Sequence, residues 1–224
     1  RSSDLVFFTH GGGNIGDLWL GPSKQRESLI RAFPDHKVIV FPQSVYYADK
    51  AKERESLARL ATFPNLHVCA RDMPSYVTLI AGGLSEANVH LVPDMAFMIG
   101  SLTPFYTRAP FNVSLLARTD KERVSDVDLV RYASKQDRQQ SGVFMHDWKG
   151  AKSLGAGNVQ AEENNSPEWR VMLLTARGNQ AITAGRVFVS DRLHGMIMAL
   201  LTGRPHFFHD NSYKKVSALR NTWL

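Results

Sequence analysis

Short apolar runs alternate with amphipathic stretches along most of the chain, which is the pattern of β-strands followed by α-helices. The apolar runs predict strands at residues 5–8, 38–41, 66–69, 89–92, 112–116, 143–145, 187–189 and 206–208. Helical spacing of apolar positions predicts helices at residues 49–62, 73–81, 168–183 and 193–201, and another that follows a glycine cluster and runs to about residue 33. This alternation predicts an α/β fold with mainly parallel sheets.

The alternating pattern is interrupted between residues 100 and 110, where two prolines occur and no periodicity is visible. We therefore expect a domain boundary there, with one half at residues 1–105 and the other at residues 106–224. Residues 120–140 are polar and predict mixed helix and loop. Residues 150–166 are rich in glycine, asparagine and serine, and predict a flexible loop.

The composition is that of an ordinary globular protein, with 43% hydrophobic and 21% charged residues. The formal net charge of +6 suits anionic small molecules or solubility alone. No basic run is interleaved with aromatic residues, so we expect no nucleic-acid partner. No apolar run reaches the roughly 18–20 residues that span a bilayer, so we expect no integral membrane segment. Because the chain enters a strand soon after Arg1, we expect further sequence upstream.

A glycine cluster follows the first predicted strand and matches the G-x-G-x-x-G pattern of nucleotide-binding turns in Gly11-Gly12-Gly13-Asn14-Ile15-Gly16. A nicotinamide site also needs an acid near the end of the second strand, and residues 41–44 contain none. The polar residues His10, Asn14 and Asp17 nevertheless surround the predicted turn. The cluster is either a ligand-binding turn or a tight strand-to-helix turn with no ligand.

Three polar residues, Asp191, Arg192 and His194, stand between a buried strand and an apolar helix. A guanidinium binds phosphate or carboxylate through two parallel hydrogen bonds, and imidazole is well suited to proton transfer. Arg118 follows another strand in the same way, and two separated arginines suit a compact polyanion. The alternative is structural: Asp191 caps the helix, Arg192 pairs with a surface acid and His194 is a satisfied structural residue. For Arg118 the structural alternative is an ion pair with Asp120 or Glu122. The histidine and aspartate groupings lack metal-ligand spacing, so we expect no metal.

Several short motifs occur in the order seen in the polysaccharide pyruvyl transferase family, which the chain resembles over nearly its whole length. They are Gly11-Gly12-Gly13-Asn14-Ile15-Gly16-Asp17-Leu18-Trp19, Phe41-Pro42-Gln43-Ser44, Ala70-Arg71-Asp72, Val92-Pro93-Asp94, Leu116-Ala117-Arg118-Thr119-Asp120, Ser190-Asp191-Arg192-Leu193-His194-Gly195 and Asp210-Asn211-Ser212-Tyr213-Lys214. The resemblance implies two Rossmann-like halves facing across a cleft, as in GT-B glycosyltransferases, and a chain that is incomplete at both ends.

The same resemblance implies a transferase that moves the enolpyruvyl unit of phosphoenolpyruvate onto a polysaccharide or glycan as a ketal, without a cofactor. It implies catalytic roles for His194 and Arg192. The implied substrate-binding residues are Arg118, Asp191, Gly12, Gly13, Asn14, Asp17 and Lys214, with the glycines on the acceptor side. It also implies a bacterial cytoplasmic enzyme, with peripheral membrane contact through a lipid-linked acceptor, or a Golgi enzyme in a eukaryote. Two alternatives stay open: a GT-B glycosyltransferase that uses a nucleotide sugar, and an inactive glycan-binding relative.

Overall fold

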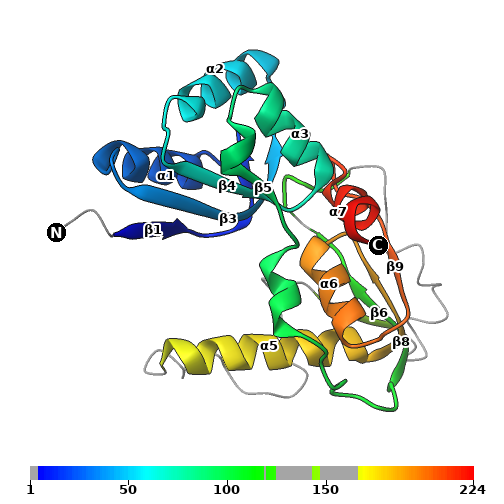
Figure 1. Ribbon diagram of the computed structural model, residues 1–224. Coiled ribbons are helices and arrows are strands. Elements are labelled where there is room, and N and C mark those ends of the chain that lie inside the picture. Colours follow the sequence, from blue (N-terminus) through cyan, green and yellow to red (C-terminus); the bar gives the residue numbers. More distant parts are fainter. Residues whose placement is uncertain (1–4, 119, 125–142, 147–165) are drawn as a thin grey trace. The chain divides into compact units, whose positions relative to one another are not determined.

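The computed structural model describes residues 5–118, 120–124, 143–146 and 166–224 (Figure 1). The chain forms two compact units, the first comprising Arg1–Met98 with Ser217–Leu224 and the second comprising Ile99–Val216. Both are α/β structures with parallel sheets, which confirms the predicted fold class. The division at residues 105 and 106 stays a prediction. Most of the region predicted as mixed helix and loop (residues 125–140), and residues 150–165 of the predicted loop, lie outside the described residues.

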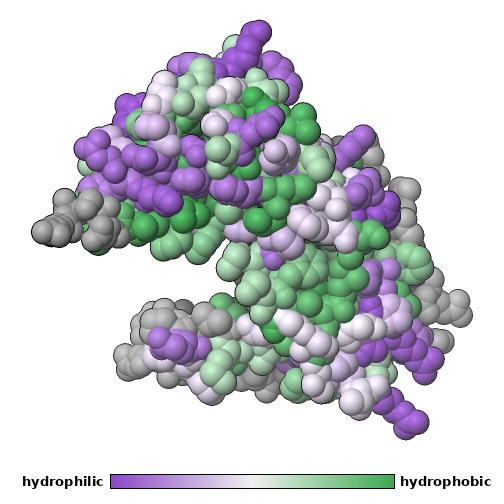
Figure 2. Space-filling model, in the orientation of Figure 1, coloured by the Kyte–Doolittle hydropathy of each residue, from purple (hydrophilic) through white to green (hydrophobic). Residues whose placement is uncertain are grey.

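Sheet A of the first unit has the strand order β1-β3-β4-β5, with β2 also paired to β3, and every pairing is parallel. Its strands are β1 (Val6–Thr9), β2 (Gly12–Gly16), β3 (Lys37–Tyr46), β4 (Leu66–Ala70) and β5 (Val89–Leu91). Three helices accompany it: α1 (Leu20–Ala32), α2 (Lys50–Ala61) and α3 (Met73–Ala81). The core is formed by apolar residues of these helices with alternate residues of the strands, among them Ile30, Leu57, Leu79, Val40 and Val68. The outer surface of α1 and α2 is largely hydrophilic (Figure 2).

The glycine cluster is not the predicted strand-to-helix turn. The register that pairs Thr9 with Val40 continues to Gly12 and Gln43, so β2 extends the line of β1 along the edge of β3. Helix α1 begins only at Leu20. The glycines are needed for close backbone approach, because a Cβ on Gly16 would lie 1.7 Å from the carbonyl oxygen of Tyr46. The G-x-G-x-x-G pattern therefore reflects packing of one strand against another.

Strand β3 also runs past the predicted end at Pro42. The register between β3 and β4 shifts between Val40 and Gln43, and Pro42 lies in that interval. Proline lacks the N–H that a regular ladder requires, and such an irregularity tolerates it. The strand therefore continues through Gln43 and Ser44 and brings both side chains into the interior.

Sheet B of the second unit has the parallel order β7-β6-β8-β9. Its strands are β6 (Phe111–Leu116), β7 (Val143–His146), β8 (Gly185–Ser190) and β9 (His206–Phe208), with helices α5 (Pro167–Thr183) and α6 (Leu193–Leu201). Apolar residues of the strands and both helices form its main cluster, including Leu116, Phe188, Ile182 and Ala199. No helix in the described part of the chain has the length and apolar character that crossing a bilayer requires.

Helix α7 (Lys215–Trp223) was not predicted from the sequence. Its last residues belong to the first unit, where Trp223 Nε1 donates to the carbonyl oxygen of Arg71 at 2.8 Å. Thr222 Oγ1 accepts from the backbone N–H of Met73 at 2.9 Å. These hydrogen bonds join segments about 150 residues apart, and no local sequence pattern predicts them.

Candidate functional site

Charged side chains gather where the strands of sheet B end. Parallel strands have their carboxyl ends at the same edge of the sheet, and in α/β folds ligands bind at that edge. Arg118 follows β6, Arg192 follows β8, and Lys215 lies seven residues after β9. The structure thus brings together residues that are nearly 100 positions apart in the sequence.

Arg118 is held by two carboxylates. Its Nε and Nη2 donate to the two oxygens of Asp120 at 2.9 and 3.1 Å, and Nη2 also lies 2.7 Å from Glu122 Oε2. The side chain is almost fully buried. Burial lowers the pKa of Arg118, but the hydrogen bond and charge of Asp120 and the charge of Glu122 outweigh it, so the net pKa is raised. The guanidinium is therefore a permanent positive charge of fixed orientation, and the ion pairs considered as its structural role are present.

Arg192 reaches the same carboxylate, since its Nη1 lies 3.7 Å from Asp120 Oδ2. Its own position is set by its backbone N–H, which donates to Ser190 Oγ at 3.0 Å, and by the start of α6 immediately after it. Burial tends to raise the pKa of Asp120, but the hydrogen bond and charge of Arg118, followed by smaller contributions, lower it overall. Asp120 is thus an anionic bridge between guanidinium groups from two strand ends.

A second layer of polar contacts lies around Glu122, which is 3% exposed. Its Oε2 accepts from Lys215 Nζ and from Asn211 Nδ2, the latter at 3.2 Å. Lys215 Nζ also donates to Tyr213 Oη at 3.1 Å. The sequence predicts Lys214 as a substrate contact. Lys214 is exposed and adopts φ 60°, whereas its neighbour Lys215 joins the buried network. A substrate contact by Lys214 stays a prediction.

Asp191 does not cap helix α6 as the structural alternative supposed. The N-cap of α6 is Arg192, with no side-chain capping bond, and the carboxylate of Asp191 instead accepts from the backbone N–H of Arg118 at 2.9 Å. Burial raises the pKa of Asp191, against the opposing effects of the Arg118 N–H and charge. Asp191 therefore fixes the backbone at the end of β6; its contact with substrate stays a prediction.

His194 lies in the first turn of α6, two residues after Arg192, and its side chain is exposed. The glycine that follows it packs tightly, because a Cβ on Gly195 would lie 3.0 Å from Ser190 Oγ and 3.3 Å from the ring of Phe188. The close packing of Gly195 fixes the start of α6 against β8, and so fixes the backbone that carries His194. The catalytic role of His194 stays a prediction.

In the first unit, Asn14 of β2 joins His10 and Gln43. Asn14 Nδ2 lies 3.0 Å from His10 Nε2, and the backbone N–H of Asn14 donates to Gln43 Oε1 at 3.1 Å. Gln43 Nε2 donates to the carbonyl oxygen of His10 at 2.7 Å. Asp17 is used differently, since its two oxygens accept from the backbone N–H groups of Ala48 and Asp49, each at 3.0 Å. The sequence predicted that His10, Asn14 and Asp17 surround one turn, but the hydrogen bonds of Asp17 fix the loop before α2.

Two other family-like motifs form a buried network at the carboxyl ends of β4 and β5. Arg71 Nη1 lies 2.7 Å from Asp94 Oδ2, and Arg71 Nε donates to Ser44 Oγ at 2.9 Å. Ser44 Oγ donates to Asp72 Oδ2 at 2.5 Å, and Asp72 caps α3 through Ser75 N–H at 2.9 Å. These motif residues therefore hold the loops of the first unit in place. Within the described residues, no group of three or more histidine, cysteine, aspartate or glutamate side chains is placed to hold a metal ion.

Comparison with known proteins decides the family. The sequence profile of the family "Polysaccharide pyruvyl transferase" matches residues 2–166. The chain belongs to the polysaccharide pyruvyl transferase family. Pyruvyl transferase 1 of Schizosaccharomyces pombe is 30% identical over 96% of the chain and 54% of that protein. EpsO of Bacillus subtilis, described as a candidate pyruvyl transferase, is 26% identical over 99% of the chain and 70% of that protein.

A solved structure supports the fold of this family member. The crystal structure of an uncharacterized protein from Klebsiella pneumoniae matches 96% of the chain and 70% of that protein, with a TM-score of 0.61 and 21% identity. The chain spans about half the length of the S. pombe relative. The chain therefore shares the fold of the Klebsiella protein and covers only part of the S. pombe relative.

Proposed function

We propose that the protein transfers the enolpyruvyl unit of phosphoenolpyruvate to a saccharide as a pyruvate ketal, and that the donor binds at the carboxyl edge of sheet B. The observation that carries this proposal is that Arg118 and Arg192, from two different strand ends, both reach Asp120. Two guanidinium groups that meet on one carboxylate are close enough to share one ligand anion of similar size. Phosphoenolpyruvate has two such groups, a phosphate and a carboxylate.

The carboxylates around the arginines suit this role. Asp120 and Glu122 hold Arg118 in one orientation, so little side-chain entropy is lost when an anion binds. The start of α6 adds backbone N–H groups and the positive end of the helix dipole next to Arg192. As phosphate departs, guanidinium groups already in place stabilise the developing charge without rearranging.

The reaction needs only proton transfers and anion stabilisation. A proton added to the methylene carbon of the donor makes it a methyl group and leaves an oxocarbenium-like centre at C2. One acceptor hydroxyl adds to C2 and loses its proton, and inorganic phosphate leaves with the C–O bonding pair. A second hydroxyl then adds to C2 and loses its proton, which closes the ketal. Of the two protons lost by the hydroxyls, one balances the proton on the methyl group and the other leaves with phosphate.

Roles follow for the remaining predicted residues. His194 supplies or relays the proton, because it lies in the turn that carries Arg192 and its side chain is exposed. The acceptor side is formed in the first unit by the β2 segment, with contributions from Gly12, Gly13, Asn14 and Asp17, and Lys214 contacts substrate in the second. The two units constitute GT-B-like halves. No metal or organic cofactor takes part, and a lipid-linked saccharide would bring the protein to a membrane surface.

The test is incubation of the whole protein with phosphoenolpyruvate and a panel of galactose- and mannose-containing acceptors, followed by mass spectrometry. The expected result is a product carrying the mass of one ketal-linked pyruvate, with one phosphate released per transfer. Thermal shift measured with phosphoenolpyruvate and with nucleotide sugars runs in parallel. Stabilisation by nucleotide sugars alone, with no ketal product, would replace the proposal with a glycosyltransferase; stabilisation by neither donor would favour an inactive relative.

A further inference from the structure

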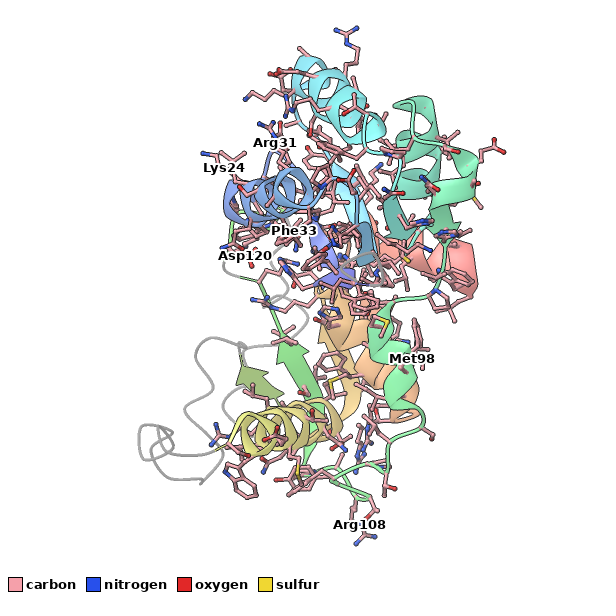
Figure 3. The ribbon with its side chains drawn as sticks, turned by 60° about the vertical axis from the view of Figure 1, so that its left-hand side comes forward. Lys24, Arg31, Phe33, Met98, Arg108 and Asp120 are labelled. Carbon is pink, nitrogen blue, oxygen red and sulfur yellow. The ribbon has the colours of Figure 1, made fainter. Side chains whose placement is uncertain are left out.

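Arg26 is an unusual residue of helix α1, because its guanidinium is buried inside the first unit. Lys24 and Arg31 of the same helix extend into solvent, as expected of a charged face (Figure 3). Arg26, in contrast, is 5% exposed and lies on the inner face with Ile30. A buried cation is costly unless it is paired, so this position calls for an explanation.

No carboxylate of the described residues forms an ion pair with Arg26 within 4.0 Å, and its Nε has no hydrogen-bond partner among them. Burial lowers the pKa of Arg26 to about 10, with weaker opposing contributions from Tyr47 and Glu27. At pH 7 the group is still charged. The direct contact that the structure does give this guanidinium is a hydrogen bond from Nη2 to Asn14 Oδ1.

This contact fixes the orientation of the Asn14 amide. A guanidinium has only donors, so the carbonyl oxygen of Asn14 must face Arg26 and its NH₂ group must face away. The NH₂ group lies 3.0 Å from His10 Nε2. The imidazole nitrogen opposite an NH₂ group has to accept, so in the neutral ring the proton is on Nδ1. Gln43 holds the backbones of both Asn14 and His10 and keeps the pair in register.

We propose that Arg26 is a positioning residue: through Asn14 it fixes His10 as the Nδ1–H tautomer, which presents an outward hydrogen-bond donor to an oxygen of the saccharide acceptor. Binding of the saccharide by His10 rests on the proposed function, whereas the tautomer of His10 does not. His10 is exposed, so its imidazole is accessible to a ligand, while Asn14 behind it is half-buried and Arg26 is buried. A hydrogen-bond donor of fixed orientation loses little entropy when a ligand binds, and it favours a ligand oxygen over a ligand N–H group.

The tautomer is tested by long-range ¹H–¹⁵N NMR of the imidazoles in the whole protein at a pH at which they are neutral, with His10→Gln used to assign the signal. The wild type is expected to show His10 with a protonated Nδ1 and an unprotonated Nε2. Arg26→Met removes the donors at similar length, frees the Asn14 amide to rotate, and should move the ring toward the Nε2–H form. Lys24→Met, on the solvent face of the same helix, should leave the spectrum unchanged. A wild-type His10 with Nε2 protonated overturns the proposal without reference to any variant.

The acceptor role is tested by steady-state kinetics of pyruvyl transfer. Loss of one well-placed hydrogen bond corresponds to about a 10-fold change, so Arg26→Met and His10→Ala should each raise KM for the acceptor about 10-fold and leave KM for phosphoenolpyruvate unchanged. Arg26→Lys, which retains a donor toward Asn14, should recover most of the loss. Equal effects on both KM values in a folded Arg26→Met protein would contradict the assignment. If the wild type transfers no pyruvate, the proposed function is wrong, but the NMR measurement still tests the tautomer of His10 independently.

Discussion

Replacement of Glu122 by glutamine tests whether the cluster beside sheet B is a buried ion network. Glu122 is 3% exposed, and its Oε2 lies 2.7 Å from Arg118 Nη2 and contacts Lys215 Nζ. Glutamine has nearly the same shape, but it removes the negative charge that lies between buried Arg118 and buried Lys215, while Arg118 keeps its ion pair with Asp120. Removing one partner of a buried pair typically costs about 3–5 kcal/mol, because the remaining charge is uncompensated. That is a large share of the roughly 5–15 kcal/mol that stabilises a typical domain.

The assay is urea unfolding, with hydrogen exchange of β6 and β8 amides reporting the second unit separately. Glu122→Gln should lower the free energy of unfolding of the second unit by about 3–5 kcal/mol. Adding Lys215→Met to Glu122→Gln also removes the buried lysine charge that Glu122 had paired with, and should recover part of the loss. The matched control is Glu53→Gln, because Glu53 pairs with Lys50 at 2.6 Å while that lysine is 75% exposed, and it should cost under about 1 kcal/mol. A Glu122→Gln loss no larger than the control would refute the reasoning.

Three further results are expected. Gly16→Ala should strongly destabilise the first unit, because its Cβ would overlap the carbonyl oxygen of Tyr46 at 1.7 Å; unchanged thermal unfolding would contradict the β2–β3 packing. Asp120 has a lowered pKa, so its stabilisation is complete above its unfolded pKa of about 3.9 and is lost as pH falls through the lower folded value. The loss of unfolding free energy in Asp120→Asn relative to wild type should therefore shrink on acidification. A loss that grows would contradict a lowered pKa for Asp120. His194→Ala should reduce kcat about 10²–10⁴-fold while exposed His90→Ala does not, and near wild-type turnover would remove His194 from the mechanism.

Local periodicity was sufficient to predict most of the secondary structure. Helix α3 occupies the predicted residues, and β4, β8 and β9 lie within two residues of their predicted limits. These elements carry a regular apolar pattern that matches their burial, as at Leu66, Val68 and Ala70. The predictions were wrong or incomplete where tertiary contacts determine the secondary structure. The β2 segment is a strand because it lies along β3, and α7 ends on Arg71 and Met73 of the first unit.

The positions of the candidate-site residues were predictable only in part. A guanidinium after each of two parallel strands indicated convergence, and Arg118 and Arg192 do meet on Asp120. Sequence gave no way to choose between Lys214 and Lys215, because the backbone at φ 60° turns one outward and the other to Glu122. The role of Arg26 was also missed, since a charged residue on an amphipathic helix is ordinarily taken to be exposed. Burial beside a carboxamide is visible only in three dimensions.

The central claim is that Arg118 and Arg192 together form the donor-binding site. Isothermal titration of phosphoenolpyruvate into the whole protein tests it most directly, with Arg192→Lys as the variant and exposed Arg108→Lys of the same unit as the control (Figure 3). We predict saturable binding by wild type and control, weakened about 10-fold or more in Arg192→Lys because ammonium cannot form the paired hydrogen bonds. Equal affinity in all three proteins, or no binding by the wild type, would contradict the account.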